Sequence, residues 1–145
     1  MLLEEFSLYS KNLWVGVGCQ KETSQELIEA AIIHVFREHQ LSQNAIAGIA
    51  TIDTKADEAG LVELCRKQNW LLKTFPAEVL RTVYVPNPSQ LIYKHIATPS
   101  VAEAAALCAA ECKSLLVSKQ IFRSVIQDQK GTVTVAIAQV EERKV

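Results

Sequence analysis

Leu13-Trp14-Val15-Gly16-Val17-Gly18 is the stretch that decides the fold, because a short apolar run rich in β-forming residues ends there in glycines. Such a run is typical of a buried strand that opens into a loop. A capping pattern, Thr23-x-x-Glu26, follows it and precedes apolar residues at helical spacing up to about His39. A buried strand followed at once by an amphipathic helix indicates an α/β sheet.

Strands and helices alternate over the rest of the chain as well. The predicted elements are, in order, a strand at 46–52, a helix from about 55 to 67 capped by Thr54-x-x-Asp57, a strand at 71–75, two short helical pieces around an extended segment at 82–85, a helix at 101–111 capped by Ser100-x-x-Glu103, and strands at 115–117, 121–126 and 132–138. The last two strands can form an antiparallel hairpin. Five or six strands with three main helices predict a three-layer α/β/α fold with a mixed sheet.

Composition indicates one ordinary domain and excludes several classes of protein. The 145 residues are 49% hydrophobic and 21% charged, with a formal net charge of -1, so no overall field attracts nucleic acid. The first residues are acidic where a secretory signal would be basic, and no apolar run approaches the ~20 residues that a membrane span needs. We therefore expect a cytoplasmic protein without a membrane partner, with an N-terminal extension at 1–12 and a domain at 13–145.

The cysteines and histidines form no recognisable catalytic or metal motif. The four cysteines lack CxxC spacing, so we expect free thiols. Cys108 and Cys112 stand four apart, as two metal ligands on one helix face could, but burial among the neighbouring small residues is the alternative. The histidines at 34, 39 and 95 have no partner at a spacing typical of a general base or a metal ligand. We predict neither a metal nor a cofactor.

Three predicted helix starts carry the candidate binding residues. Ligands of open α/β sheets bind beyond the carboxyl ends of the strands, where helix N-termini attract anions. In the first loop, Gly16 and Gly18 could let the backbone approach a ligand carboxylate, Lys21 could supply the counter-charge, and Thr23 or Ser24 could donate a hydrogen bond. The alternative is a tight strand-to-helix turn with an ordinary cap. Neither a dinucleotide-binding GxGxxG pattern nor a P-loop is present.

The second start offers an acid and a base beyond a strand end. Asp53, Lys55 and Glu58 could activate water or pair with substrate groups. Alternatively, Lys55 and Glu58 form a surface helix pair of little energetic weight.

The third start contains Ser100 and Glu103, which could bind a ligand or only cap the helix and orient the loop. Lys119 follows a predicted strand and could meet a carboxylate, although an exposed lysine there needs no special role.

Five segments in this order resemble the C-terminal domain of the cobalamin biosynthesis protein CbiG and its standalone relative CobE. The segments are GVGC (16–19), ATIDTKADEAGL (50–61), TPSVAEAAAL (98–107), LLVSK (115–119) and TVTVAIA (132–138). The resemblance runs from about Leu13 to Ala138 and implies a role in building the corrin ring of vitamin B12. Cys19 and Thr51, which belong to the first two segments, are counted with the ligand-binding candidates.

The resemblance implies three possible functions. Full CbiG proteins are cobalt-precorrin-5A hydrolases that open the ring-A lactone and release acetaldehyde, but this sequence has no counterpart of their N-terminal and middle regions. The leading expectation is a domain that binds a corrin-ring precursor, with the acetate and propionate carboxylates of the precursor at helix N-termini and lysines. One alternative is a hydrolase component in which Asp53 or Glu58 activates water and Lys55 stabilises negative charge. The other is a non-catalytic docking module that passes intermediates between cobalamin-pathway enzymes.

Overall fold

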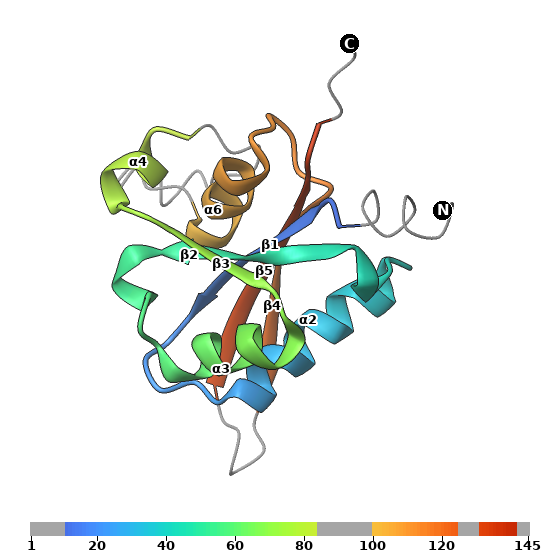
Figure 1. The fold of residues 1–145 in the computed structure, drawn as a ribbon, viewed down its shortest axis with the longest axis vertical. Coiled ribbons are helices and arrows are strands. Elements are labelled where there is room, and N and C mark those ends of the chain that lie inside the picture. Colours follow the sequence, from blue (N-terminus) through green and yellow to red (C-terminus); the bar gives the residue numbers. More distant parts are fainter. Residues whose placement is uncertain (1–10, 84–99, 125–130, 142–145) are drawn as a thin grey trace.

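Five strands form one mixed sheet in the order β3-β2-β1-β5-β4, as the computed structural model shows (Figure 1). The structure describes residues 11–83, 100–124 and 131–141. The strands are β1 (Leu13–Cys19), β2 (Ile46–Ile52), β3 (Leu71–Phe75), β4 (Val117–Ser124) and β5 (Gly131–Gln139). The first three are mutually parallel, and β5 runs antiparallel to both β1 and β4. The predicted α/β fold with a mixed sheet is confirmed.

Helices cover both faces of this sheet and complete three layers (Figure 1). On one face lie α2 (Gln25–Glu38) and α3 (Ala59–Gln68). On the other lie α6 (Val101–Ala110) and the short α4 (Ala77–Arg81). Two 3₁₀ turns, η1 (Gln43–Ala45) and η2 (Asp53–Lys55), flank β2.

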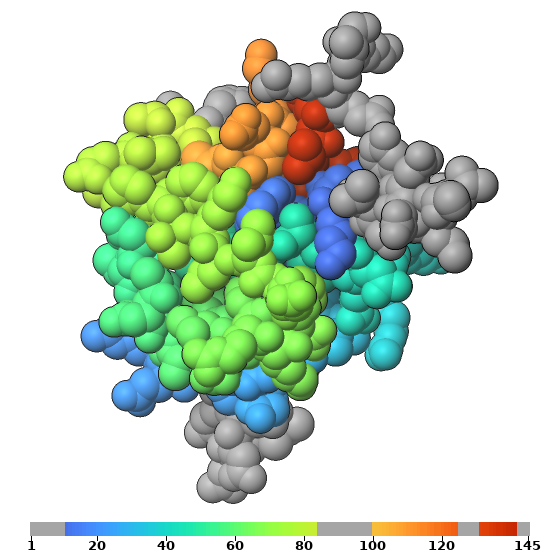
Figure 2. All heavy atoms as spheres, viewed as in Figure 1, coloured from blue at the N-terminus to red at the C-terminus, as the bar shows by residue number. Residues whose placement is uncertain are grey.

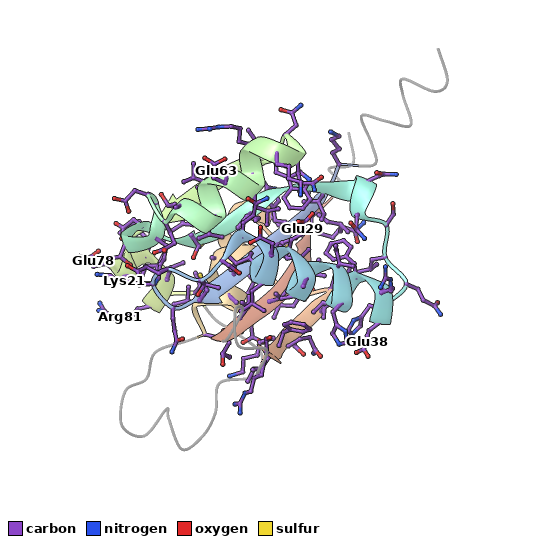
Figure 3. The ribbon with its side chains drawn as sticks, turned by 90° about the horizontal axis from the view of Figure 1, so that it is seen from below. Lys21, Glu29, Glu38, Glu63, Glu78 and Arg81 are labelled. Atoms are coloured by element: carbon purple, nitrogen blue, oxygen red, sulfur yellow. The ribbon has the colours of Figure 1, made fainter. Side chains whose placement is uncertain are left out.

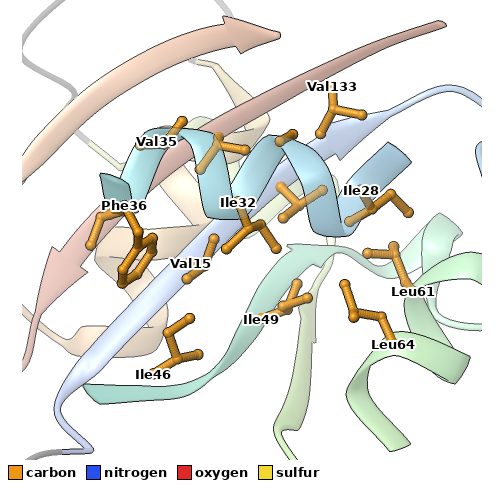
Figure 4. Packing of buried hydrophobic residues seen from close by; sticks show 14 of the residues in the cluster. Val15, Ile28, Ile32, Val35, Phe36, Ile46, Ile49, Leu61, Leu64 and Val133 are labelled. Atoms are coloured by element: carbon orange, nitrogen blue, oxygen red, sulfur yellow. The ribbon is translucent and has the colours of Figure 1, made fainter. Parts of the chain in front are cut away.

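The core beneath α2 and α3 is built from branched and aromatic side chains. Figure 4 shows Ile28, Ile32 and Phe36 of α2 lying over Val15 and Ile49 of the central strands. All five side chains are fully buried. Burying a side chain of this size contributes about 1.5–3 kcal/mol, so this face supplies much of the stability.

The core beneath α6 is made of small residues and depends on Gly16. A Cβ at Gly16 would lie 1.8 Å from the carbonyl oxygen of Ala102. The alanine-rich face of α6 therefore approaches the backbone of β1 directly, and only glycine fits at this point. Trp14 and Leu80 close this second core at its rim.

Several predicted boundaries are corrected by the structure. The N-cap of α2 is Ser24 rather than Thr23. The helix predicted from about residue 55 begins at Ala59, since Asp53–Lys55 form η2 instead. The strands predicted at 115–117 and 121–126 are one strand, β4, whose register shifts between Val117 and Gln120. Thr82 ends α4 in a helical conformation rather than starting an extended segment, and residues 84–99 and 125–130 lie outside the described residues.

Candidate functional site

Three helix N-termini face the edge of the sheet at which the parallel strands end. Because β1 and β2 are parallel, α2 and α3, which follow them, both begin at this edge. α6 lies on the other face and runs antiparallel to β1: Ala102 in its first turn abuts Gly16, whereas its last turn lines a hollow with Trp14. The three helix starts therefore share one edge, two on one face and the third on the other.

Cys19, the last residue of β1, marks the point where the ends of β1 and β2 meet. Burial raises the pKa of the Cys19 thiol, and the Glu58 carboxylate raises it further. The positive charge of Lys55 and a hydrogen bond with Thr23 lower this pKa, but by less than burial and Glu58 together raise it. A thiol that keeps its proton at neutral pH is a poor nucleophile. The structure therefore makes Cys19 a neighbour of the η2 charges rather than a reactive group.

Lys55 presents a cation without an ion-pair partner among the described residues. Its side chain is half-buried at the end of η2. The ion pairs that the described part of the chain forms are His34–Glu38, Arg66–Glu63 and Lys67–Glu29. The surface pair of Lys55 with Glu58, which was the alternative to a functional site, is not among them, and Glu58 accepts a hydrogen bond from the backbone N–H of Glu22 instead. The Lys55 ammonium is thus available to an anion.

The N-termini of α2 and α3 meet across an acidic groove of about 390 Å³. Gly60 allows their close approach, since a Cβ there would lie 2.4 Å from the carbonyl oxygen of Thr23. The carboxylates along this groove belong to Glu22, Glu26, Glu58 and Glu63, the last of which is labelled in Figure 3. These carboxylates already complement the positive ends of the two helix dipoles and repel a further anion. A carboxylate-rich ligand is therefore excluded from this groove.

The hydroxyl groups near the first two helix starts serve the protein itself. Ser24 caps α2 by accepting a hydrogen bond from the N–H of Leu27 at 3.0 Å. Thr51 is fully buried and donates to the carbonyl of Val17 at 2.7 Å, which ties β2 to β1. Thr23 donates to a carbonyl of its own loop at 2.6 Å. The geometry gives all three structural roles.

Lys21 and Asp53 project from this edge of the molecule. Figure 3 places Lys21 at the same end as Glu78 and Arg81 of α4. Asp53 is exposed, and its side chain makes no hydrogen bond or ion pair within the parts of the chain that the structure describes. Both side chains are free to meet a ligand or a water molecule.

The two glycines of β1 differ sharply in what covers them. Gly16 is buried beneath α6, so a ligand cannot reach its backbone, and the close approach expected there is made by the protein. Gly18 lies on the same face two residues on, where a Cβ would meet, among the described residues, only the Cβ of Thr134 at 3.7 Å. Of the two glycines, Gly18 therefore remains the candidate for close approach by a ligand.

Glu103 ties α6 to β4 rather than completing a capping box. Ser100 caps the helix, accepting a hydrogen bond from the N–H of Glu103 at 3.4 Å. The fully buried Glu103 carboxylate turns away and accepts a hydrogen bond from the backbone N–H of Lys119 at 2.9 Å. Its other oxygen has no hydrogen-bond partner among the described residues. The contact holds the start of β4 against α6 and with it the backbone of Lys119.

Sequence reasoning missed the role of Glu22. This residue takes a left-handed conformation with φ of 64°, and its N–H binds Glu58 across the two loops. A non-glycine residue in this conformation carries no local sequence signal, so only the folded structure shows that the loops after β1 and β2 are joined.

Metal ligation finds no support in the described ranges, in which no group of three or more His, Cys, Asp or Glu side chains could hold an ion. Cys108 and Cys112 are half-buried against the α6 core, as the packing alternative requires. No helix within residues 11–83, 100–124 and 131–141 is long and apolar enough to cross a membrane.

Comparison with known protein families gives one match, which covers nearly all of the domain. The model of the cobalamin synthesis G C-terminus matches residues 13–138. The chain belongs to this family. Family membership supports a role in cobalamin biosynthesis, and it confirms the resemblance inferred from the sequence segments.

Individual relatives agree with this assignment. The chain is 29% identical over 138 residues to the cobalt-precorrin-5A hydrolase of Priestia megaterium, covering 94% of this chain and 35% of the relative. It thus spans about a third of the length of the curated relatives it matches. The crystal structure of CobE, a protein from the cobalamin pathway, superposes with a TM-score of 0.68 at 28% identity over 87% of this chain and 93% of CobE. The crystal structure of the cobalamin biosynthesis protein chiG from Agrobacterium tumefaciens superposes with a TM-score of 0.59 at 31% identity. The superposition covers 90% of this chain and 99% of chiG.

Proposed function

We propose that the chain binds an anionic corrin-ring precursor at the edge where β1, β2 and β3 end. The observation that carries the proposal is the unpaired Lys55 cation, which lies beside Cys19 at the meeting point of two parallel strands. Peripheral carboxylates of a tetrapyrrole would form charge-assisted hydrogen bonds with this ammonium. Lys21 at the same edge would supply a second cation.

The acidic groove between α2 and α3 directs such a ligand toward the α6 side of the edge. There Gly18 leaves room for a Cβ among the described residues, and α6, capped by Ser100, presents the positive end of its helix dipole. Lys119 is held near the same helix start through its backbone hydrogen bond to Glu103. Lys21, Lys55, the α6 N-terminus and Lys119 together would suit a macrocycle with several carboxylates rather than a single small anion.

A catalytic contribution to a larger hydrolase is a second candidate, favoured by the freedom of Asp53. Glu58, the other candidate base, already accepts a hydrogen bond from Glu22. The exposed Asp53 carboxylate makes no hydrogen bond or ion pair among the described residues and could therefore orient a water molecule. Lys55, next to it in η2, would stabilise a developing oxyanion.

Titration of the intact chain with precorrin and cobalt-precorrin intermediates tests the first proposal, because the macrocycle absorbs visible light. We expect a saturable spectral change with one intermediate bound per chain. The absence of any saturable change across the pathway intermediates would contradict it. The same mixtures, assayed for acetaldehyde and the opened lactone of cobalt-precorrin-5A, test the second candidate: multiple turnovers would support hydrolysis by this domain.

A further inference from the structure

The sheet edge opposite the helix N-termini carries a groove that the proposed function does not use. This groove holds about 450 Å³ and lies where β1 begins and β5 ends. The residues that line it, here called the β5-end groove, are Asn12, Cys112, Ser114, Leu115, Leu116, Gln139, Val140 and Glu141. Leu116 is 45% exposed and Val140 41% exposed, although both are large apolar residues.

Hydrogen bonds of the backbone fix the walls of the β5-end groove. The N–H of Leu116 donates to the carbonyl of Ile137 at 2.9 Å, and the N–H of Val140 donates to the carbonyl of Asn12 at 2.9 Å. The two apolar side chains therefore stand on a rigid base. Figure 2 shows the end of β5 beside the α6 segment at this pole of the molecule.

A second hollow of about 420 Å³ adjoins the first and shares Val140 and Glu141 with it. Trp14 lines it, and the Nζ atom of Lys73 lies over the Trp14 ring, 4.7 Å from the centroid. Glu111 and Glu141 also line it. The joined surface thus sets the exposed Leu116 and Val140 side chains among mainly polar groups, with two carboxylates beside them. Such a mixture is compatible with a non-obligate protein interface, which as a whole is no more apolar than the rest of a protein surface.

We infer that the β5-end groove docks the polypeptide region that precedes this domain in the longer members of the family. The matched family model describes a C-terminus, and the match covers only 35% of the Priestia megaterium relative, so most of that relative lies ahead of the matched segment. In such a protein the preceding region connects to the domain just before Leu13. Asn12 itself lines the groove, so the connection passes along it.

The chemistry of the groove defines the segment that fits. An apolar side chain would cover Leu116 and Val140, and a lysine or arginine would meet the carboxylates of Glu111 and Glu141. The region can be part of one longer chain or a separate protein, since the surface is the same in both cases. This inference concerns a protein partner and does not depend on corrinoid binding.

The first test measures access to the Cys112 thiol, which lies in the groove. The complete chain is fused behind the preceding region of the Priestia megaterium relative, and alkylation by N-ethylmaleimide is followed by peptide mass spectrometry. Cys19, at the opposite edge, is the internal reference. We expect alkylation of Cys112 to be at least tenfold slower in the fusion than in the chain alone, with Cys19 unchanged. Equal rates at Cys112 in a folded fusion would overturn the inference.

The second test needs no fusion and measures binding of the separately produced region to the complete chain, without corrinoid. Leu116→Glu and Val140→Glu should each weaken binding at least tenfold. Ile121→Glu is the matched control, because Ile121 is 53% exposed on β4 and outside the groove. No detectable binding between the separate region and the chain would overturn the inference. An equal loss of binding in all three variants would overturn it as well. Dimers of the chain that Leu116→Glu abolishes would assign the groove to a second copy and overturn it too.

Discussion

Replacing Gly16 by alanine is expected to destabilise the fold strongly, because α6 leaves no room for a methyl group. The new Cβ would lie 1.8 Å from the carbonyl oxygen of Ala102, 2.8 Å from the carbonyl carbon, and 3.0 Å from the Cβ of Ala106. Two of these atoms belong to backbone, so the helix itself must move. Overpacking a core costs about 1–3 kcal/mol, and a forced helix shift places Gly16→Ala at about 3 kcal/mol.

Gly18→Ala is the matched control, since it changes the same strand on the same face. Its Cβ would make an ordinary contact of 3.7 Å with Thr134, so the expected change is within about 0.5 kcal/mol. Urea unfolding followed by circular dichroism gives both free energies, and thermal unfolding should place the Tm of Gly16→Ala roughly 6–12 °C below the wild type. Equal stability of the two variants would refute the argument that helix packing requires Gly16.

Three further predictions concern ionisable groups. Lys55→Ala should weaken corrinoid binding by about 1.5–3 kcal/mol. Lys67→Ala is the control, because it removes an ion pair distant from the site and should leave the affinity unchanged. Equal affinities of Lys55→Ala and the wild type in a titration would remove Lys55 from the site. Glu103→Ala should cost about 1–3 kcal/mol in urea unfolding, because the N–H of Lys119 loses its acceptor, whereas Glu103→Gln keeps an acceptor and should cost less. Burial raises the pKa of Cys65 from 9.0 to about 11. Above pH 9 the thiol therefore ionises in the unfolded chain before it ionises in the folded one, so the free energy of unfolding should decrease between about pH 9 and pH 11. A Cys65→Ala variant that shows the same decrease would contradict this.

The strands were predictable because burial leaves a direct pattern in the sequence. The segments 46–52 and 71–75 coincide with β2 and β3. β2 is buried along most of its length and reads as a short apolar run between turn residues. β3 is the half-buried edge strand, and its apolar residues ahead of Pro76 still marked it as a strand. β4 was predicted as two strands because the shift between Val117 and Gln120 interrupts the alternation on which the prediction relied.

The capping residues were less predictable because alternatives compete for the same donors. Thr23 and Ser24 are both suitable caps, and the choice of Ser24 depends on the hydrogen bond that draws Thr23 to a carbonyl of the loop. Glu103 has the spacing of a capping box, but a backbone N–H sixteen residues later takes its carboxylate. Such long-range competition leaves no trace in a local pattern.

The location of the candidate site followed from topology, whereas its electrostatics did not. The rule that ligands bind beyond the ends of parallel strands led to the correct segments for a shared edge. The acidic groove could not be predicted, because its carboxylates come from two segments that meet only through Gly60. The alternative of a Lys55–Glu58 surface pair could not be decided for the same reason, since Glu22 of the other segment binds the Glu58 carboxylate.

The two surfaces proposed here lie at opposite ends of the same strands, and this separation bears on catalysis. β1 contains seven residues, so its ends are about 20 Å apart. A region docked only in the β5-end groove would leave Lys55 and Asp53 open to solvent and to a corrinoid. It could complete an active site around Asp53 only by extending across one face of the sheet. Both faces are covered by helices, so such a region would have to pass over α2 and α3 or over α6. Docking confined to the groove therefore favours a function in which the domain holds the precursor while the chemistry takes place elsewhere. Hydrolysis at Asp53 would require the docked region to extend from the groove across a face of the sheet.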